Sequence, residues 1–310
     1  MENTPVKSAE KAAETIHPVL QFLMFVGVLI GTFIVGNLIG AGLVYAIYGL
    51  KTFMAIAEMN TAVPNFVPAV WILQIAGTTL PILAAPLLFS RFIVNDTQEY
   101  IKPGFKFPLV MLLLVVGIMF ASMPLIEFLS NLNQKMVLPH FLKWMRDSED
   151  SAEKLTNALL KMDNIGQMVF NLMFIGLFTA IVEEFMFRGV MQTMFIKWFK
   201  NKHAAIWLTA ILFSAFHMEF FGFLPRMMLG VLFGYFVVYS GSIWPAVLGH
   251  FINNGTDVVL TYLSQHKLIA MSTDDQHVFN TTAYIFSFII ILILFWVYHK
   301  VNISKKPAQV

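Results

Sequence analysis

The sequence contains no cysteine, and only 12% of its 310 residues are charged. The absence of cysteine excludes disulfides, thiolate catalysis and cysteine-ligated metal sites. Soluble domains carry about a quarter charged residues, so a fraction this low argues against a soluble fold. The net charge is +2, which provides no extended field for nucleic acid or for a strongly acidic partner.

Apolar residues are abundant instead and make up 58% of the chain. A hydrocarbon core of about 30 Å needs roughly 20 consecutive apolar residues in a helix. Residues 20–50 and 109–128 each provide such a run, and residues 283–298 are almost as apolar. We therefore expect an all-α fold, a polytopic bundle of transmembrane helices.

Apolar windows separated by charged residues predict about eight membrane spans. They are expected near residues 19–49, 66–90, 107–128, 166–186, 203–217, 222–240, 243–263 and 281–299. Residues 187–200 are predicted to form a separate amphipathic helix at the membrane interface. The fifth span is short for a perpendicular crossing, so we expect it either to tilt or to continue beyond His217.

The spans are interpreted as a single transmembrane domain, residues 19–300, with a motif-bearing core at 170–260. A polar N-terminus, residues 1–18, precedes this domain, and a short tail, residues 301–310, follows it. The one sizeable polar insertion is the extramembrane loop 129–165. This loop is either a lid or substrate-docking element, or a solvated connector.

Two short helices are expected within this loop. Phe141–Met145 is apolar enough for a helix of interfacial character. Ser151 is expected to cap a second helix that follows from Lys154 to Met162.

Lysine and arginine in the short loops predict the orientation, because cytoplasmic loops retain positive charge. An even number of spans puts both termini on one side of the membrane. The basic residues on that side are Lys7, Lys11, Arg91, Lys102, Lys106, Lys197, Lys200, Lys202, Lys300, Lys305 and Lys306. Both termini are therefore expected in the cytoplasm.

Two adjacent acids stand near the end of the fourth predicted span. Ionisable side chains at bilayer depth cost about 2.5–3.5 kcal/mol each on insertion scales, so each requires an explanation. Arg188 lies four residues after Glu184, shares its helix face and is expected to pair with it. Glu183 then remains for chemistry, because a carboxylate in an apolar pocket holds a proton more strongly and suits a general base. The alternative is an interfacial charge pair that ends the helix.

Two later spans each contribute a histidine. His217 ends the fifth span, with Phe213 one turn earlier on the same face. His250 and Asn254 share a face of the seventh span, and both can donate hydrogen bonds to a developing oxyanion. Taken alone, each is better explained as a structural contact, worth about 0.6 kcal/mol between membrane helices. Asp257 lies near the same face as Asn254, and no chemistry is assigned to it.

Taken together, a carboxylate, two histidines and an amide on three helices match the needs of hydrolysis within a membrane. Water must be bound, deprotonated and directed at a carbonyl group, and the oxyanion must be stabilised. The sequence contains no His-Glu-x-x-His zinc motif, no Gly-x-Ser-x-Gly nucleophile elbow and no glycine-rich phosphate loop. An intramembrane peptidase is therefore the favoured interpretation.

At these positions the chain resembles the CPBP family, the CAAX-protease and bacteriocin-processing (Abi-type) group of intramembrane proteases. The family motifs are Glu-Glu-x-x-x-Arg, Phe-x-x-x-His and His-x-x-x-Asn, on successive transmembrane helices. Here the motifs are Glu183-Glu184 with Arg188, Phe213 with His217, and His250 with Asn254. The resemblance is strong over residues 170–260 and does not extend to specific residues of the first three spans.

The resemblance implies a CAAX-protease-like core of eight helices and a CAAX prenyl endopeptidase-like activity. Glu183 would activate water with help from His217, and His250 with Asn254 would form the oxyanion hole. The residues that would brace this site are Glu184 and Arg188.

The resemblance also favours a glutamate-type hydrolase that needs no metal. A zinc-dependent version with Glu183, His217 and His250 as ligands stays open, because carboxylate and imidazole groups both bind zinc. The expected partners are membrane lipid and a membrane-tethered or lipidated peptide or protein, with no nucleic acid. The expected location is the inner (plasma) membrane of a bacterium.

Two other classes of protein are alternatives to a peptidase. A non-catalytic immunity or scaffold protein of the same fold would have no need to keep Glu183 and His217, which are both present. A proton-coupled transporter would use buried Glu, Arg and His as an ion path. That class usually shows paired repeats with matching broken helices, and the sequence shows none.

Overall fold

The computed structural model describes residues 16–137, 139–269 and 278–303. Within these ranges the regular structure is helical and includes no strand, which confirms the all-α prediction. Most of the predicted N-terminal segment 1–18 and of the predicted tail 301–310 lies outside the described residues.

Six helices of the described chain are long and apolar enough to cross a membrane. They are Pro18–Ala57, Phe66–Ile93, Val110–Gln134, Ile165–Phe199, Phe220–Ser240 and Thr281–Val301. The fifth and seventh predicted spans are also helical, as α11 (Lys202–Phe216) and α13 (Trp244–Gln265), but they do not meet the same criteria. α11 has only 15 residues, and the polar motif residues of α13 lower its mean hydropathy.

The fourth predicted span and the expected interfacial helix at 187–200 form one continuous helix, Ile165–Phe199. The separate helix predicted at 187–200 is therefore wrong. No proline interrupts this segment, and the pairing of Arg188 with Glu184 satisfies both charges without a break. The parts of the helix are α8 (Ile165–Asn171), η4 (Leu172–Phe178), α9 (Thr179–Glu184), η5 (Phe185–Met191) and α10 (Gln192–Phe199), of which η4 and η5 are π-helical.

The fifth predicted span ends at its histidine and does not continue beyond it. The N–H groups of His217 and Met218 bond to carbonyl groups three residues earlier, at 3.3 and 3.1 Å, which closes the helix. Met218 then adopts φ of 56°, a left-handed conformation that ends the helix. A 3₁₀ turn, η6 (Phe220–Gly222), leads into α12 (Phe223–Ser240).

The polar insertion 129–165 is largely helical. α6 (Val110–Gln134) extends into it, and η3 (His140–Leu142) is followed at once by α7 (Lys143–Leu159). The two short helices expected there are one helix, because neither glycine nor proline interrupts the sequence between them. Ser151 lies inside α7, where its Oγ donates to the carbonyl oxygen of Asp147 at 2.8 Å, so the predicted cap is wrong.

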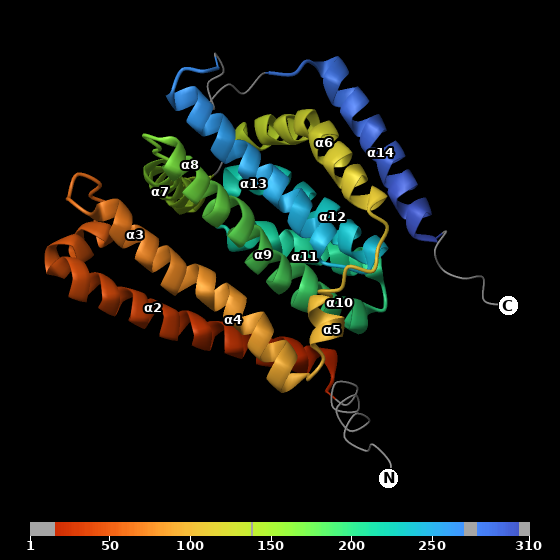
Figure 1. The fold of residues 1–310 in the computed structure, drawn as a ribbon, viewed down its shortest axis with the longest axis horizontal. Helices are drawn as coiled ribbons and strands as arrows, with labels where there is room; N and C mark the ends of the chain where they lie inside the picture. Colours follow the sequence, from red (N-terminus) through yellow and green to blue (C-terminus); the bar gives the residue numbers. More distant parts are fainter. Residues whose placement is uncertain (1–15, 138, 270–277, 304–310) are drawn as a thin grey trace, which may run out of the picture. The chain divides into compact units, whose positions relative to one another are not determined.

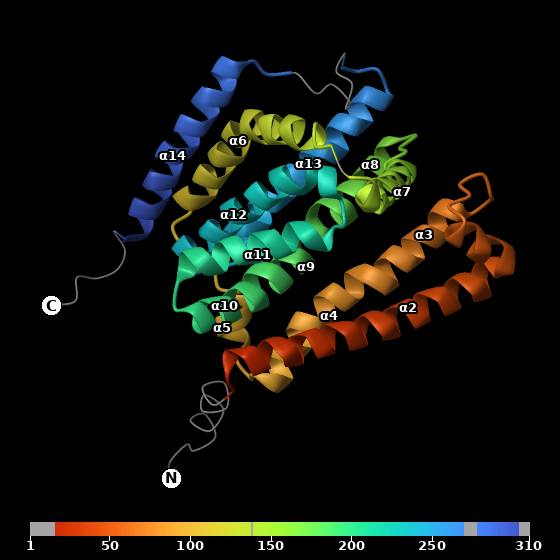
Figure 2. The same cartoon turned by 180° about the vertical axis from the view of Figure 1, so that it is seen from behind.

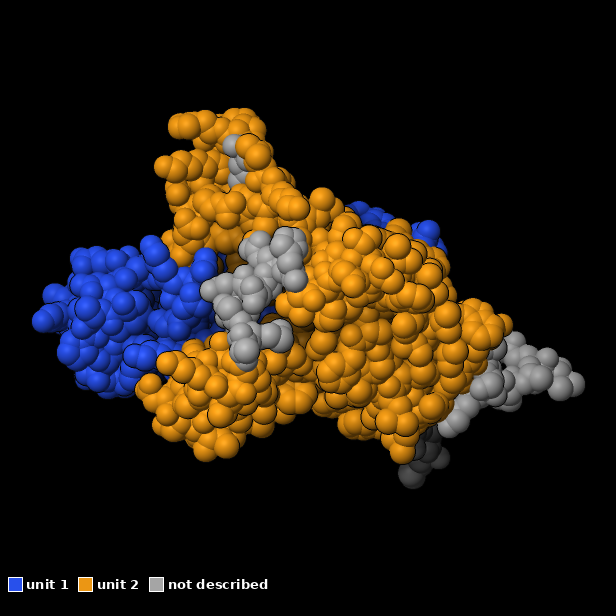
Figure 3. Space-filling view, turned by 90° about the horizontal axis from the view of Figure 1, so that it is seen from above, with its two compact units in different colours: residues 1–102, 153–161, 182–201 blue, residues 103–152, 162–181, 202–310 orange. Residues whose placement is uncertain are grey.

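The chain forms two compact units (Figure 3). The first unit contains residues 1–102, 153–161 and 182–201, and the second contains residues 103–152, 162–181 and 202–310. The long helix Ile165–Phe199 contributes residues to both units, with the change between residues 181 and 182.

In the first unit, α2 (Pro18–Ala57) packs along α3 (Phe66–Gln74), η1 (Ile75–Thr79) and α4 (Leu80–Leu88), as Figures 1 and 2 show. A Cβ at Gly36 would overlap the carbonyl oxygen of Ala76, so only glycine permits this close approach. The chain continues through η2 (Phe89–Ile93) and α5 (Thr97–Ile101). η5 packs against α4 and α5, and α10 packs against α2.

In the second unit, α6 packs against α12, α13 and α14 (Thr281–Ile303), and α11 packs along α12. The pairing of α14 with α6 is visible from both sides (Figures 1 and 2). Ser287 fixes it with a hydrogen bond from its Oγ to the carbonyl oxygen of Ala121, at 2.6 Å. α13 also contacts η4, so the two histidine-bearing helices and part of the glutamate-bearing helix belong to one packed unit.

Candidate active site

The Glu-Glu-x-x-x-Arg motif contains a fully buried ion pair. Arg188 Nη1 donates to Glu184 Oε1 at 2.8 Å, and both side chains are 0% exposed. The expected pairing is therefore present, while its supporting role in catalysis stays a prediction. Glu183 is only half-buried, which shows that the two adjacent acids occupy different environments.

The backbone beside this pair is closely packed. A Cβ added at Gly189 would lie 2.8 Å from the carbonyl oxygen of Tyr100, which precedes the end of α5. Contacts this short are essentially never seen, so glycine is required for α5 to approach the helix directly after Arg188. The pair is therefore next to a closely packed part of the first unit.

α9, which carries Glu183 and Glu184, lies between the π-helical segments η4 and η5. π-helical turns are rare and occur frequently at functional sites, but η1 and η2 are also π-helical and contain no motif residue, so the π-helical turns do not mark the site by themselves. Single-sequence patterns carry no distinct signal for them, so this feature of the motif helix could not be predicted.

The histidine of the second motif is held by the carbonyl group one turn before it. His217 Nδ1 lies 2.8 Å from the carbonyl oxygen of Phe213. A carbonyl oxygen can only accept a hydrogen bond, so Nδ1 carries a proton, and in the neutral ring the lone pair is then on Nε2. This tautomer suits a histidine that receives a proton or a hydrogen bond through Nε2.

Phe213 contacts both histidines of the motif set. Its ring centroid lies 5.0 Å from that of His217 and 5.8 Å from that of His250, edge to face in both cases. His250 is buried and also stacks on Phe233, at 5.0 Å and 18°. The structure therefore brings His217, directly after α11, and His250 of α13 onto one aromatic side chain within the second unit.

The amide of Asn254 is oriented by two hydrogen bonds. Its Nδ2 donates to the carbonyl oxygen of Ile175 in η4 at 3.2 Å, and its Oδ1 accepts from Asn253 Nδ2 at 3.1 Å. Asn253 and Ile175 were not predicted as site residues. Ile175 could not have been, because every residue has a backbone carbonyl group and the sequence does not show which one accepts this bond. Asp257 is exposed on α13, and it remains without assigned chemistry.

The motif residues divide between the two units. Glu183, Glu184 and Arg188 belong to the first unit, and the two histidines with Asn254 belong to the second. That Glu183 acts together with the histidines stays a prediction from the motifs.

A zinc site was the open alternative. Among the residues that the structure describes, no group of three or more His, Asp or Glu side chains is arranged to hold a metal ion. The alternative with Glu183, His217 and His250 as ligands therefore rests on ligand chemistry alone.

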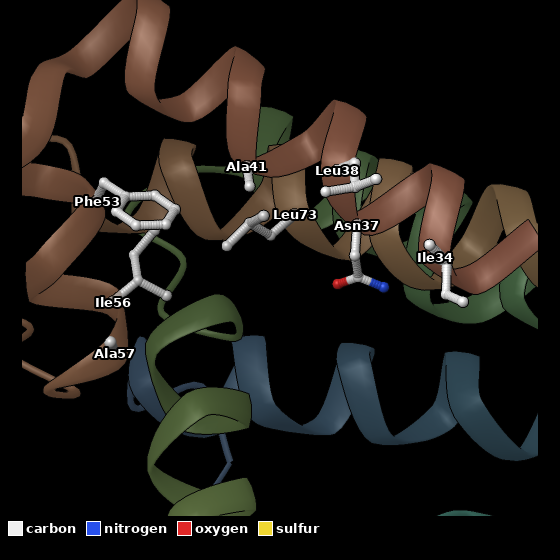
Figure 4. A pocket seen from close by; sticks show the side chains of 8 residues that line it. All are labelled: Ile34, Asn37, Leu38, Ala41, Phe53, Ile56, Ala57 and Leu73. Atoms are coloured by element: carbon white, nitrogen blue, oxygen red, sulfur yellow. The ribbon is translucent and has the colours of Figure 1, made fainter. Parts of the chain in front are cut away.

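A groove elsewhere in the first unit contains none of the motif residues. It has a volume of about 530 Å³ and lies between α2 and α3 (Figure 4). Its polar member is Asn37, whose Nδ2 donates to the carbonyl oxygens of Phe33 and Gly77, each at 2.9 Å. The rest of its lining is apolar, so it provides no group for hydrolysis.

Comparison with known proteins identifies the segment that carries the motifs. Residues 165–256 match the family described as type II CAAX prenyl endopeptidase Rce1-like. The uncharacterized protein YpbD of Bacillus subtilis (strain 168) is 25% identical over 112 residues, which are 35% of this chain and 53% of that protein. The match thus spans about half the length of that relative. No solved structure gives a significant match.

These findings agree with the motif assignment. The matched segment contains Glu183-Glu184 with Arg188, Phe213 with His217, and His250 with Asn254 in the expected order. Six apolar helices of sufficient length and a family of intramembrane proteases together support an integral membrane protein. Residues 165–256 are therefore similar to the CAAX-type intramembrane proteases of the CPBP group.

Proposed function

We propose that this protein is an intramembrane endopeptidase that hydrolyses a peptide bond in a membrane-tethered or lipidated protein or peptide. One observation carries the proposal. Two histidines from separate segments contact the same Phe213 within the part of the chain that matches a peptidase family, and the bond of His217 Nδ1 to the carbonyl group of Phe213 orients its ring.

Glu183 is the proposed general base. Its carboxylate accepts a proton from water as the water oxygen forms a bond to the carbonyl carbon of the substrate. His217 holds the same water through Nε2. The proton then passes to the leaving amine as the carbon–nitrogen bond breaks, so that one water and one peptide bond give one acid and one amine.

His250 and Asn254 are the proposed oxyanion hole. The bond from one Asn254 N–H to Ile175 and the bond from Asn253 to Oδ1 orient the amide. Its second N–H is the group proposed to donate to the oxyanion. Pre-oriented donors are effective because they need no rearrangement when charge develops.

The Glu184–Arg188 pair is proposed to brace the helix beside Glu183. The charges of Glu184 and Arg188 compensate each other on the buried face, so the helix can carry Glu183 as a second acid beside them. We further propose that the protein lies in a bacterial plasma membrane with both termini in the cytoplasm, on the basis of the lysine and arginine distribution.

The test is turnover of a fluorogenic lipidated peptide by the detergent-purified protein. Glu183→Ala and His217→Ala should abolish cleavage without loss of folding. Asp257→Asn is the matched control, because it removes an exposed carboxylate with no assigned chemistry, and it should keep wild-type activity. Wild-type turnover by Glu183→Ala would disprove the general-base role.

Metal dependence is tested in the same assay. A chelator should leave turnover unchanged if the glutamate mechanism holds. Loss of turnover on chelation, restored by zinc, would favour the zinc-dependent version instead.

A further inference from the structure

The turn that follows His217 is held by an element outside α11 and α12. Asn133, near the end of α6, donates from Nδ2 to the carbonyl oxygen of Phe220 at 3.0 Å. Its Oδ1 accepts from the N–H of Leu224 at 2.6 Å. One amide therefore ties the start of η6 and the first turn of α12 to α6.

The first half of α7 contacts the same turn through its polar groups. Glu149 Oε2 accepts a hydrogen bond from the N–H of Phe221 at 2.7 Å. Ser148 Oγ donates to the carbonyl oxygen of Met218 at 3.4 Å. α7 thus bonds to the backbone of the turn at two points.

Side chains of α7 also pack on the aromatic residues of the turn. The guanidinium of Arg146 lies 3.2 Å from the ring centroid of Phe221. Trp144 meets the ring of Phe220 edge to face, with centroids 5.2 Å apart. Both rings of the turn are therefore covered by α7.

This turn needs such contacts because its local conformation is unfavourable. Met218, directly after His217, has φ of 56°, which is uncommon for a residue other than glycine. A residue in that conformation persists when surrounding contacts hold it. Release of the turn would let Met218 relax and would move the backbone that carries His217.

We infer that the first half of α7 is a clasp that positions His217, and that Glu149 is the positioning residue through which it acts. The inference rests on the proposed catalytic role of His217. It gives the polar insertion before α8 a function in the reaction, by fixing a catalytic group that it does not itself provide.

Charge around Glu149 makes the clasp sensitive to pH. The charged groups that face it are Arg146 on α7, Glu219 in the turn and Arg226 on α12. Burial raises the pKa of the Glu149 carboxyl above its usual value, Glu219 adds to this rise, and the bond from Phe221 with the two arginines opposes it.

The sign of the pH effect follows from this raised pKa. The carboxylate accepts the hydrogen bond from Phe221 more strongly than the neutral acid does. As the pH falls, Glu149 takes up its proton at a higher pH than an ordinary glutamate, and the clasp weakens there. A glutamine at this position keeps an acceptor oxygen and cannot titrate.

The first experiment compares Glu149→Ala, Glu149→Gln and Asp150→Ala in turnover of the fluorogenic lipidated peptide by the purified full chain. Asp150 is the control, an exposed acid on the same helix. Misplacement of a catalytic group by about 1 Å can cost about 100-fold, so Glu149→Ala should lower kcat at least about tenfold and leave KM unchanged. Glu149→Gln should have the wild-type kcat at neutral pH. As the pH falls, its kcat should decline less than that of the wild type, because the side chain at position 149 no longer titrates. Asp150→Ala should match wild type.

The second experiment measures amide hydrogen exchange over residues 217–224, which does not require turnover. Exchange should rise in Glu149→Ala and stay unchanged in Asp150→Ala. Unchanged exchange and kcat in Glu149→Ala would overturn the clasp, and so would an equal loss of kcat in the alanine and glutamine variants. If the wild type hydrolyses no peptide while amide exchange is faster in Glu149→Ala, the proposed function is wrong. The clasp would then hold the turn but would have no catalytic role.

Discussion

The Glu184–Arg188 pair and the turn after His217 show two ways to hold polar groups in a largely apolar protein. The pair is fully buried and local in sequence, and the glycine that follows Arg188 is packed closely against α5. The turn is only partly buried, and side chains from α6 and α7 hold its backbone. A change at the pair should therefore damage stability first, whereas a change at the turn should damage positioning first.

The largest effect is expected from breaking the buried pair. Glu184→Ala or Arg188→Ala leaves one buried charge without its partner, which typically costs about 3–5 kcal/mol. Thermal unfolding in detergent should show a clear drop in Tm, together with lower activity. The double variant Glu184→Leu with Arg188→Met should be more stable than either single variant. If Glu184→Ala or Arg188→Ala kept the wild-type Tm, the pair would not contribute to stability more than the turn does.

A smaller loss is expected at the glycine beside the pair. Gly189→Ala places a methyl group 2.8 Å from a backbone oxygen that cannot swing away, and overpacking of this kind costs about 1–3 kcal/mol. Gly42→Ala on α2 is the control, because nothing lies within 4 Å of its Cβ position. The two variants should differ in Tm, and equal values would contradict the tight packing of α5 against η5.

The smallest loss of stability is expected at the aromatic contact between the histidines. Phe213→Leu keeps a branched apolar side chain in a buried position, so it should cost well under the roughly 3–5 kcal/mol of a Phe→Ala change. It removes the ring edge that contacts both His217 and His250. We expect kcat to fall while Tm stays within a few degrees. Loss of Tm without loss of kcat would assign Phe213 to packing alone.

The helices and the Glu184–Arg188 pair could be predicted because they depend on residues that are close together in the sequence. Apolar runs indicate membrane helices wherever they are long enough to cover hydrocarbon, and all eight predicted segments are helical. The Glu184–Arg188 pair follows from a spacing of four residues on one helix. The predicted break at 187–200 was wrong because the charged cluster lies inside a helix that runs from residue 165 to residue 199 without a proline.

The apolar helices, the motif residues and the local ion pair each depend on composition or on one turn of helix, so they could be predicted from the residues alone. The contact of Phe213 with both histidines, the bond from Asn254 to Ile175 and the hold of α7 on the turn after His217 could be found only in the folded chain. The bond from Phe221 to Glu149 joins residues 72 positions apart. Such contacts depend on how helices pack, and no local pattern of residues specifies that packing.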